Sequence, residues 1–374
     1  MRILYVCIAL DELSPSLANQ VNWVRALTTT PGIDHVTVLA AAQVGRRPAR
    51  RRRGDRDAGG RWSSRRLRKV LRFERAVRSV DLADIDLVWI AMGGGPYPLL
   101  LLPAKLRHRL PMVQWKADSV VTARTRLYAR WCTDLLLTAT PGSLPLDVGT
   151  VRAIGHGVDT ARFAPPEVPA PRQRDLVVVG RIAPVKRIDA VLRAIAAVRD
   201  RTGTAPTLDI VGNADSAQQE LRRSLDAQVH DLDLTDAVRF VGPVPYAELP
   251  ARLATYGAMV QLGEGALDKA VLEAMAVGLP IITSNGRTIE ALPDDLAAQV
   301  TVPVDGTDAH AERIEATLAL DAAGRTALGR RLRQVVVDGH ALDTFFTRAL
   351  TACADEGLLR WPPADIASTA GGAA

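Results

Sequence analysis

Short runs of apolar residues alternate with amphipathic stretches along almost the whole chain. Five runs in its first part are nearly continuous in apolar residues, which is typical of strands buried on both faces. They are residues 3–10, 35–41, 87–92, 112–116 and 135–139. Stretches with apolar positions at helical spacing lie between these runs, at residues 17–27, 61–80 and 120–130. Buried strands that alternate with helices predict a parallel sheet covered by helices on both faces.

The alternation stops once and then resumes. Residues 163–171 hold four prolines, which prevent regular secondary structure and mark a linker. Beyond it we expect strands at 176–179, 207–211, 238–241, 258–262 and 279–283, and helices at 187–199, 217–229, 247–254 and 269–277. The pattern predicts an α/β protein with two doubly wound, Rossmann-like domains that face a cleft. We place them at residues 1–165 and 172–340, with a last helix at 341–360 that packs back on the first domain.

Two clusters of polar residues in the second domain carry candidate chemistry. Gly180 and Arg181 follow an expected strand, and Lys186 comes five residues later, ahead of a helix. At the carboxyl end of a strand both cations can converge on one diphosphate. The structural alternative is that Arg181 and Lys186 are solvated loop residues.

The second cluster is a loop that opens a helix near Lys269. A helix start after a Gly-containing loop leaves backbone N–H groups unpaired, and these groups suit a phosphate. Glu273 lies deeper in the helix, where it could accept hydrogen bonds from sugar hydroxyls. A phosphate site beside a hydroxyl acceptor indicates a nucleotide-sugar site. The alternative is a core helix with a glycine C-cap at Gly278.

Several motifs together resemble the retaining family-4 glycosyltransferases of the GT-B fold. The resemblance covers about residues 150–285, whereas the first domain is similar only in pattern. It is carried by Gly180-Arg181-x4-Lys186, the turn at Gly212, Phe240-Val241-Gly242, the LEAMAVGLPII segment that contains Glu273, and the segment from Ile154 to Pro165.

The resemblance implies a donor site for a UDP- or GDP-linked sugar in the second domain. Arg181 and Lys186 would neutralise the departing diphosphate, and Glu273 would bind the ribose. Backbone groups near Lys269 would face the phosphates. In full, the implied donor site comprises Gly180, Gly212, Val244, Gly265, Asp268, Lys269, Ala270 and Glu273.

The chain departs from the family pattern at several places, among them the loop at residues 11–16, which lacks the family's paired glycines. Gly265 stands where the family usually has a glutamate that contacts the donor sugar, and Asp268-Lys269 replace Gly-Leu. We hypothesise that Asp268 or Lys269 takes over part of that contact, although Asp268 could equally be an N-cap. In the first domain Asp118 stands near the family's usual histidine and is our third catalytic candidate. Asp118 could instead cap the helix expected at 120–130.

The implied reaction breaks a sugar–phosphate bond with retention, as a metal-independent hexosyltransferase without a cofactor. Asp84-Ile85-Asp86 and Asp231-Leu232-Asp233 resemble metal motifs but match no family site, so we expect solvated side chains. Cys7, Cys132 and Cys353 have neither zinc nor disulfide spacing, which favours a reducing cytoplasm. No apolar run reaches the roughly 18 residues of a membrane span, and we interpret residues 1–10 as a buried strand rather than a signal peptide.

Positive charge is concentrated in the segment from Arg46 to Arg78. It holds fourteen arginines and one lysine against three acidic residues, an excess larger than the net charge of +6 of the whole chain. Residues 46–57 of this segment form either a solvated loop or an electrostatic contact, with a phosphorylated acceptor or with anionic lipid headgroups at the inner membrane face; the membrane contact could extend to Arg78. Nucleic acid binding is disfavoured because no aromatic residue interleaves with the arginines before Trp62 and no nucleic-acid motif accompanies them.

The acceptor stays open: a glycan, a lipid-linked sugar and a small metabolite are all compatible. Two other functions also remain, a GT-B-like sugar-nucleotide epimerase and a non-catalytic lipid- or polyanion-binding protein. A dinucleotide-dependent dehydrogenase is disfavoured, because Met92-Gly93-Gly94-Gly95-Pro96 is not the dinucleotide-binding fingerprint.

Overall fold

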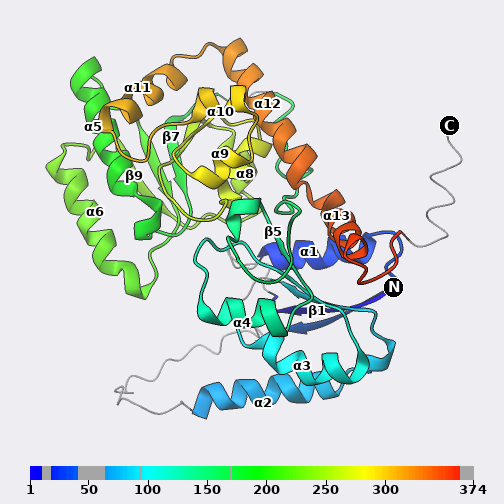
Figure 1. Ribbon diagram of the computed structural model, residues 1–374. Coiled ribbons are helices and arrows are strands. Elements are labelled where there is room, and N and C mark those ends of the chain that lie inside the picture. The colour runs from blue at the N-terminus through cyan, green and yellow to red at the C-terminus, as the bar shows by residue number, and fades with distance from the viewer. Residues whose placement is uncertain (11–17, 41–63, 92–94, 169–170, 363–374) are drawn as a thin grey trace, which may run out of the picture.

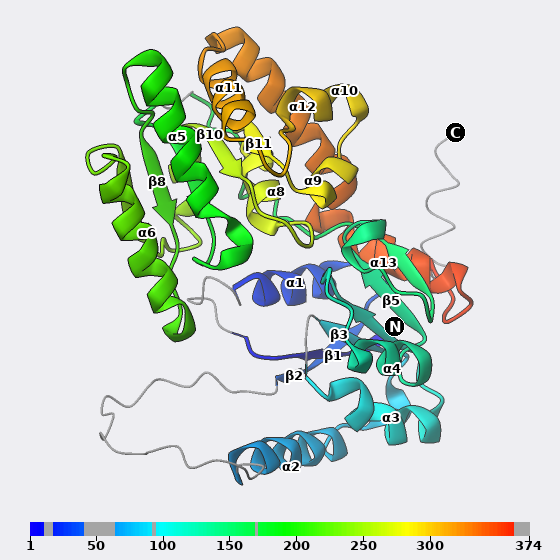
Figure 2. The same ribbon diagram turned by 60° about the vertical axis from the view of Figure 1, so that its left-hand side comes forward.

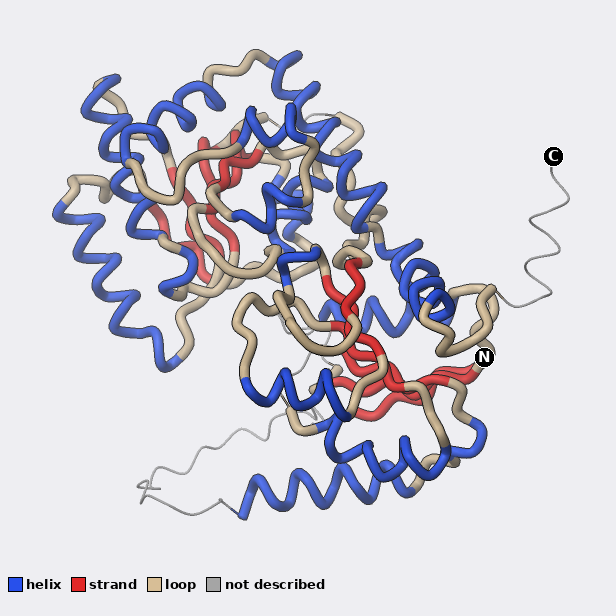
Figure 3. The backbone as a smooth tube through the Cα atoms, viewed as in Figure 1, coloured by secondary structure: helices blue, strands red, loops and turns tan. Residues whose placement is uncertain are grey.

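Two parallel sheets, each covered by helices, organise the chain (Figures 1 and 3). The structure is a computed structural model that describes residues 1–10, 18–40, 64–91, 95–168 and 171–362. The glycine-rich run at 92–94 and residues 46–63 of the basic segment lie outside the described residues. The prediction of two doubly wound α/β domains is confirmed.

The first domain has, within its described residues, a sheet of order β2-β1-β3-β4-β5-β6 in which all neighbours are parallel. Its strands are β1 (Arg2–Cys7), β2 (His35–Ala40), β3 (Leu87–Ala91), β4 (Met112–Trp115), β5 (Leu135–Thr138) and β6 (Val151–Ala153). Its helices are α1 (Ala18–Thr29), α2 (Ser64–Arg78), α3 (Tyr97–His108) and α4 (Ala123–Trp131). The sequence did not predict β6 or α3. Helix α3 has a run of leucines without helical spacing and contains Pro103.

The second domain has a sheet of order β11-β10-β7-β8-β9, again with parallel neighbours. Its strands are β7 (Arg174–Val179), β8 (Leu208–Val211), β9 (Val238–Gly242), β10 (Tyr256–Gln261) and β11 (Ile281–Thr283). Its helices are α5 (Ile188–Thr202), α6 (Gln219–Asp231), α7 (Leu249–Leu253), α8 (Lys269–Ala276), α9 (Gly286–Glu290), α10 (Asp294–Val300), α11 (Thr307–Leu318) and α12 (Ala322–His340). Every strand predicted here is present within a few residues, whereas α9 to α12 were not predicted.

Both faces of each sheet are buried, which explains the continuous apolar runs. In β7, Val177 and Val179 belong to one core cluster, whereas Leu176 and Val178 belong to another on the opposite face. Successive side chains of a strand point to opposite faces, so a strand between two helical layers needs apolar residues at every position. Cys7 ends β1 and is buried, as expected of a core residue, and burial raises the pKa of its thiol to about 11.

The last two helices connect the domains. Helix α12 packs against α8 of the second domain, and α13 (Leu342–Asp355) then packs against α1 of the first (Figures 1 and 2). Trp23 of α1 lies 4.6 Å, between ring centroids, from Phe345 of α13. Backbone hydrogen bonds join Val158 to His340 and Leu342 at 2.7 and 2.8 Å. The chain crosses between domains twice, and both crossings run side by side.

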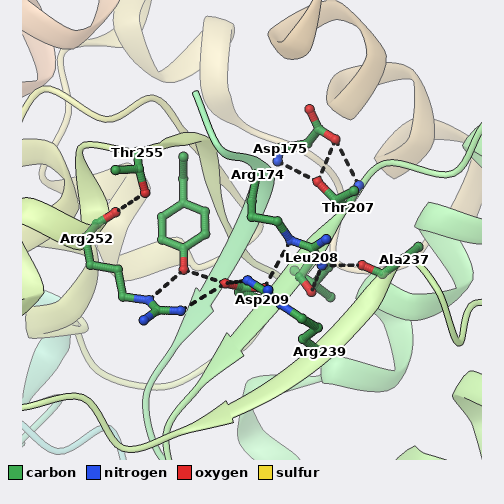
Figure 4. Close-up of polar contacts among 10 residues, drawn as sticks. Arg174, Asp175, Thr207, Leu208, Asp209, Ala237, Arg239, Arg252 and Thr255 are labelled. Carbon is green, nitrogen blue, oxygen red and sulfur yellow. Dashed lines mark hydrogen bonds and ion pairs between the residues drawn. The ribbon is translucent and has the colours of Figure 1, made fainter. Parts of the chain in front are cut away.

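The amino ends of the second domain's strands are held by a buried carboxylate. Asp209 of β8 is 1% exposed and accepts hydrogen bonds from the Tyr256 hydroxyl at 2.8 Å and from three arginines (Figure 4). The arginines are Arg174, Arg239 and Arg252. Burial alone would raise the pKa of Asp209, but these hydrogen bonds outweigh it and hold the pKa below its usual value.

Candidate functional site

The strand order of the second sheet reverses between β7 and β10. In open parallel sheets, ligands bind at the carboxyl ends of strands beside such a reversal, because the following loops diverge there and leave a crevice. The loop after β7 carries Gly180 to Lys186, and the loop after β10 leads to Asp268 and α8. Both sequence-predicted clusters therefore follow the two strands that flank the reversal.

Lys186 is brought directly to the start of α8. It ends the short 3-10 helix η3 (Pro184–Lys186), and its ammonium forms an ion pair with Asp268. Gly180 has a φ of +136°, and a Cβ on it would lie 3.0 Å from the Lys186 Nζ. Glycine at this position therefore gives the lysine side chain room to lie across the end of β7.

Asp268 is the N-cap of α8, so the capping interpretation of this residue is confirmed. Its Oδ1 accepts a hydrogen bond from the Ala270 N–H at 3.1 Å. The expectation of unpaired N–H groups at this helix start is therefore wrong for Ala270, because its partner is a carboxylate two residues earlier. The helix is also a buried core helix, and Gly278 beyond it has a φ of +77°. A buried core helix can also carry a ligand site at its amino end, so the two interpretations of α8 are compatible.

Glu273 is buried, at 4% exposure, and is already paired within the protein. It accepts a hydrogen bond from the Tyr246 hydroxyl at 2.9 Å and forms an ion pair with Lys269. The Lys269 Nζ also donates to the Tyr246 hydroxyl at 2.8 Å. Burial, and then the neighbouring Glu273 carboxylate, raise the pKa of Tyr246. Tyr246 lies in the loop after β9, two residues beyond Val244, and sequence reasoning gave it no role.

Arg181 does not lie with Lys186. Its side chain is 77% exposed, and its nearest recorded partner is Asp215, with an N–O distance of 4.0 Å. Asp215 precedes α6, on the β8 side of the loop. The expected convergence of both cations is therefore present for Lys186 alone, and Arg181 would have to change rotamer to join it.

Gly265 lies opposite a loop of the first domain. Its φ is +115°, which strongly favours glycine, and a Cβ on it would lie 3.7 Å from the Ser119 Oγ. Asp118, which precedes Ser119 in the chain, forms an ion pair with Lys116 at 2.8 Å and accepts a hydrogen bond from the Val120 N–H. The N-cap role considered for Asp118 is wrong: α4 begins later than expected, and Thr122 caps it. The loop 116–122 thus faces the loop before α8.

Two further contacts hold the domains face to face. The Leu267 N–H lies 3.4 Å from the Ser143 Oγ. Glu290 of α9 accepts hydrogen bonds from the Thr140 hydroxyl at 3.0 Å and the Gly142 N–H at 3.1 Å. All these residues follow the carboxyl ends of strands, so the corresponding edges of the two sheets face each other. Sequence reasoning had no means to find Glu290, because its partners are about 150 residues away.

A small hollow opens at the carboxyl ends of β8 and β9. It has a volume of about 150 Å³, and its lining includes Gly212, Asn213, Gly242, Arg222 and Phe240. Gly212 packs against Gly180, because a Cβ on it would lie 1.8 Å from the Gly180 carbonyl oxygen. The Arg222 guanidinium lies over the Phe240 ring, 3.5 Å from its centroid. Val244 of the next loop is half-buried against the main core.

His156 is a polar residue of the domain junction to which sequence reasoning gave no role. It is buried at 5% exposure, its ring lies 4.9 Å from that of Trp115, and its Nδ1 has no hydrogen-bond partner among the described residues. Burial first, then the nearby Lys269 and His340, lower the pKa of His156 to about 3, although Asp268 opposes them. The signal that could have found it is the segment motif from Ile154 to Pro165.

The remaining candidate motifs are structural or solvated. Asp84 pairs with Arg2 and is 61% exposed, and Asp231 is 79% exposed. Among the described residues no group of three or more His, Cys, Asp or Glu side chains is placed to hold a metal ion. Nor does any helix within those residues have the length and apolar character needed to cross a bilayer.

Comparison with known proteins finds a family model and curated relatives that are similar to the second domain. Residues 173–319 match the family model described as glycosyl transferases group 1. D-inositol 3-phosphate glycosyltransferase of Salinispora tropica is 32% identical over 202 residues, which is 49% of this chain and 41% of the relative. The chain spans about two fifths of the length of the curated relatives it matches.

Solved structures match over nearly the whole chain. Anabaena HepE, solved in complex with UDP, has a TM-score of 0.69 and 13% identity, covering 95% of this chain and 100% of HepE. Sucrose-phosphate synthase of Thermosynechococcus elongatus has a TM-score of 0.69 and 16% identity over 95% of this chain and 99% of its own. Residues 173–319 are therefore similar to the glycosyl transferases group 1 family, and the chain as a whole has the two-domain GT-B fold.

Proposed function

We propose that the protein is a retaining glycosyltransferase that moves a sugar from a nucleotide-diphosphate sugar to a hydroxyl group of an acceptor. One observation carries the proposal: Lys186, the amino end of α8 and Glu273 converge beside the strand-order reversal, opposite loops of the first domain. A cation and a helix amino end suit a diphosphate, and a buried carboxylate suits ribose hydroxyls.

The residues of the site would act mainly on the leaving group. Breaking the sugar–phosphate bond builds negative charge on the diphosphate, and Lys186 with the α8 dipole would stabilise it in place. Arg181 would add a second charge after a rotamer change. Lys269 would face the sugar or its phosphates, and Asp118 would approach the sugar from the first domain. Retention and metal independence are inferred from the resemblance to family-4 enzymes.

The hollow at Gly212 and Gly242 would hold the nucleobase. An arginine above an aromatic ring offers both hydrogen-bond donors and an apolar surface, which suits a flat heterocycle rich in acceptors. Val244 would border it from the next loop. HepE was solved with UDP, which favours a uridine nucleotide, although GDP-sugars fit the same chemistry. The acceptor is a glycan, a lipid-linked sugar or a small metabolite such as a polyol phosphate, the class that the curated relatives' name suggests.

A screen of nucleotide-sugars with product analysis tests this function. A donor should raise the melting temperature in proportion to log concentration, and mass spectrometry should show the sugar on an acceptor. Lys186→Ala should lower kcat/KM by about tenfold for each 1.4 kcal/mol of lost transition-state stabilisation. Arg193→Ala removes a cation of α5 whose ion pair among the described residues is with Asp189, and it should leave kcat/KM unchanged. Donor consumption without transfer would support the epimerase instead.

We also propose that α2 and α3 contact an anionic membrane surface. Leu71 of α2 is 47% exposed, and Leu99 and Leu106 of α3 are 48% and 70% exposed. Arg78, Arg107 and His108 line a groove between these helices together with the acidic Glu74 and Asp81, so the positive charge of this face comes mainly from the basic segment that ends at Arg78. Exposed apolar side chains among basic ones favour the interface of an anionic bilayer.

Vesicle flotation separates this contact from the catalytic proposal. Deletion of residues 46–57 together with Leu71→Ser and Leu106→Ser should abolish binding to phosphatidylglycerol vesicles. The same variant should keep its affinity for the donor. Loss of donor affinity alone, with vesicle binding retained, would contradict the membrane contact.

A further inference from the structure

Lys186 and the amino end of α8 would bind an anionic ligand, but an anion of the protein itself already occupies them. One oxygen of Asp268 pairs with the Lys186 ammonium, and the other accepts the Ala270 N–H at 3.1 Å. A side-chain cation and a backbone N–H of a helix start are also what a diphosphate would bind. The Asp268 carboxylate therefore has the contacts of a bound phosphate group.

We infer that Asp268 is an internal anion that competes with the diphosphate for Lys186 and the amino end of α8. The inference rests on the proposed donor site. It assigns Asp268 a role in selecting among ligands of that site: the aspartate weakens binding of the free nucleoside diphosphate more than binding of the donor, and so promotes release of the product.

The backbone around the pair keeps Lys186 and Asp268 opposed. Gly263, in the loop before α8, packs against η3 so closely that a Cβ on it would lie 2.3 Å from the Val185 carbonyl oxygen. At the other end of that loop Asp268 is fixed by its capping hydrogen bond. These two contacts hold the Asp268 carboxylate beside Lys186, so a diphosphate that binds Lys186 would lie close to it.

The pair is accessible enough to exchange partners. The side chains of Lys186 and Asp268 are each 19% exposed, so water can replace either partner in part. The neighbouring Lys269–Glu273 pair is similar, at 18% and 6% exposure. Both polar groups expected to bind a nucleotide are thus paired beforehand, and ligand binding is an exchange of partners rather than an addition of new ones.

The charge of each ligand determines how strongly competition with Asp268 weakens its binding. A terminal phosphate monoester loses its second proton near pH 6, whereas a phosphate esterified to a sugar cannot. At neutral pH the free nucleoside diphosphate therefore carries about one more negative charge than the donor. Repulsion by Asp268 grows with that charge, so the product is destabilised relative to the substrate.

Titration calorimetry of Asp268→Asn with UDP, GDP and the corresponding sugar nucleotides tests the inference. Asparagine is as good an N-cap as aspartate, so the helix start is kept while the charge is removed. We expect at least about tenfold tighter binding of the nucleoside diphosphate, a smaller gain for the donor, and stronger product inhibition. Asp268→Ser, which also keeps a cap, should act in the same direction.

A double-mutant cycle with Lys186→Ala locates the effect. If Asp268 acts by occupying the lysine, most of the gain should disappear in the Lys186→Ala background. Unchanged or weaker diphosphate binding by both Asp268 variants, with the wild type binding normally, would overturn the inference alone. Absence of nucleotide binding by the wild type and every variant, all with native circular dichroism, would overturn the donor site as well.

Discussion

The second sheet carries one charged cluster at each end, and the two are built differently. At the amino ends of the strands, Asp209 is 1% exposed and is surrounded by three arginines and a tyrosine (Figure 4). At the carboxyl ends, Lys186 pairs with Asp268 and Lys269 with Glu273. The first cluster has several donors for its single carboxylate, and all of these donors belong to the second domain. In the second cluster each carboxylate has one cation as its ion-pair partner, and the cluster lies opposite the first domain.

The difference separates a structural charge from an exchangeable one. A fully buried carboxylate with four donors cannot exchange them for a ligand without leaving cations unpaired, which is costly. A partly exposed pair loses little when water or a ligand replaces one partner. The surplus of donors around a buried anion therefore indicates a structural role, whereas matched pairs at a strand-order reversal indicate a binding site.

The largest expected effect on stability is at Asp209. Asp209→Ala leaves three arginines without their shared anion and should lower the free energy of unfolding by about 3–5 kcal/mol. Urea unfolding followed by circular dichroism measures this. Asp189→Ala, which breaks an exposed pair with Arg193, is the matched control and should cost less than about 1 kcal/mol. Similar losses in the two variants would remove the distinction between the clusters.

A second, pH-dependent effect is expected at the domain junction. The pKa values of His156 and His340 are lowered to about 3 and about 4, in both cases mainly by burial, with further contributions from Lys269 to His156 and Arg348 to His340. In the unfolded chain a histidine protonates near pH 6.5, so as the pH falls from there towards 4 the unfolded state binds more protons. The free energy of unfolding should therefore be unaffected by these histidines above about pH 6.5 and should decrease as the pH falls below it.

Paired variants check this assignment. In His156→Asn and His340→Asn, the free energy of unfolding should fall less between pH 7 and pH 5 than in the wild type. His230→Asn, at a side chain that is 88% exposed, should leave the pH dependence unchanged. Equal slopes in all four proteins would contradict burial of neutral histidines at the junction. The pH dependence of the free energy of unfolding bears on the second charged cluster, because His156 interacts electrostatically with Lys269 and Asp268.

Local patterns predicted the sheets and the positions of the site loops, but not the pairings within them. Continuous apolar runs such as β7 follow directly from burial on both faces, and Lys186 and Glu273 were placed by their distance from such strands. Asp268 as the partner of Lys186 depends on the rotamers of two side chains 82 residues apart, for which a single sequence gives no signal. Helix α3 was missed because its leucines have no helical period and Pro103 lies inside it.

The smallest stability effect is expected at Arg181, where stability and activity should separate. The Arg181–Asp215 pair is 77% and 53% exposed, so Arg181→Ala should change the free energy of unfolding by less than about 1 kcal/mol. If the guanidinium turns to the diphosphate in the transition state, kcat/KM should nevertheless fall about tenfold or more. Asp215→Asn frees Arg181 without removing it and should keep or raise kcat/KM. Wild-type kcat/KM in Arg181→Ala would show that this arginine stays with Asp215 and that Lys186 neutralises the leaving group without it.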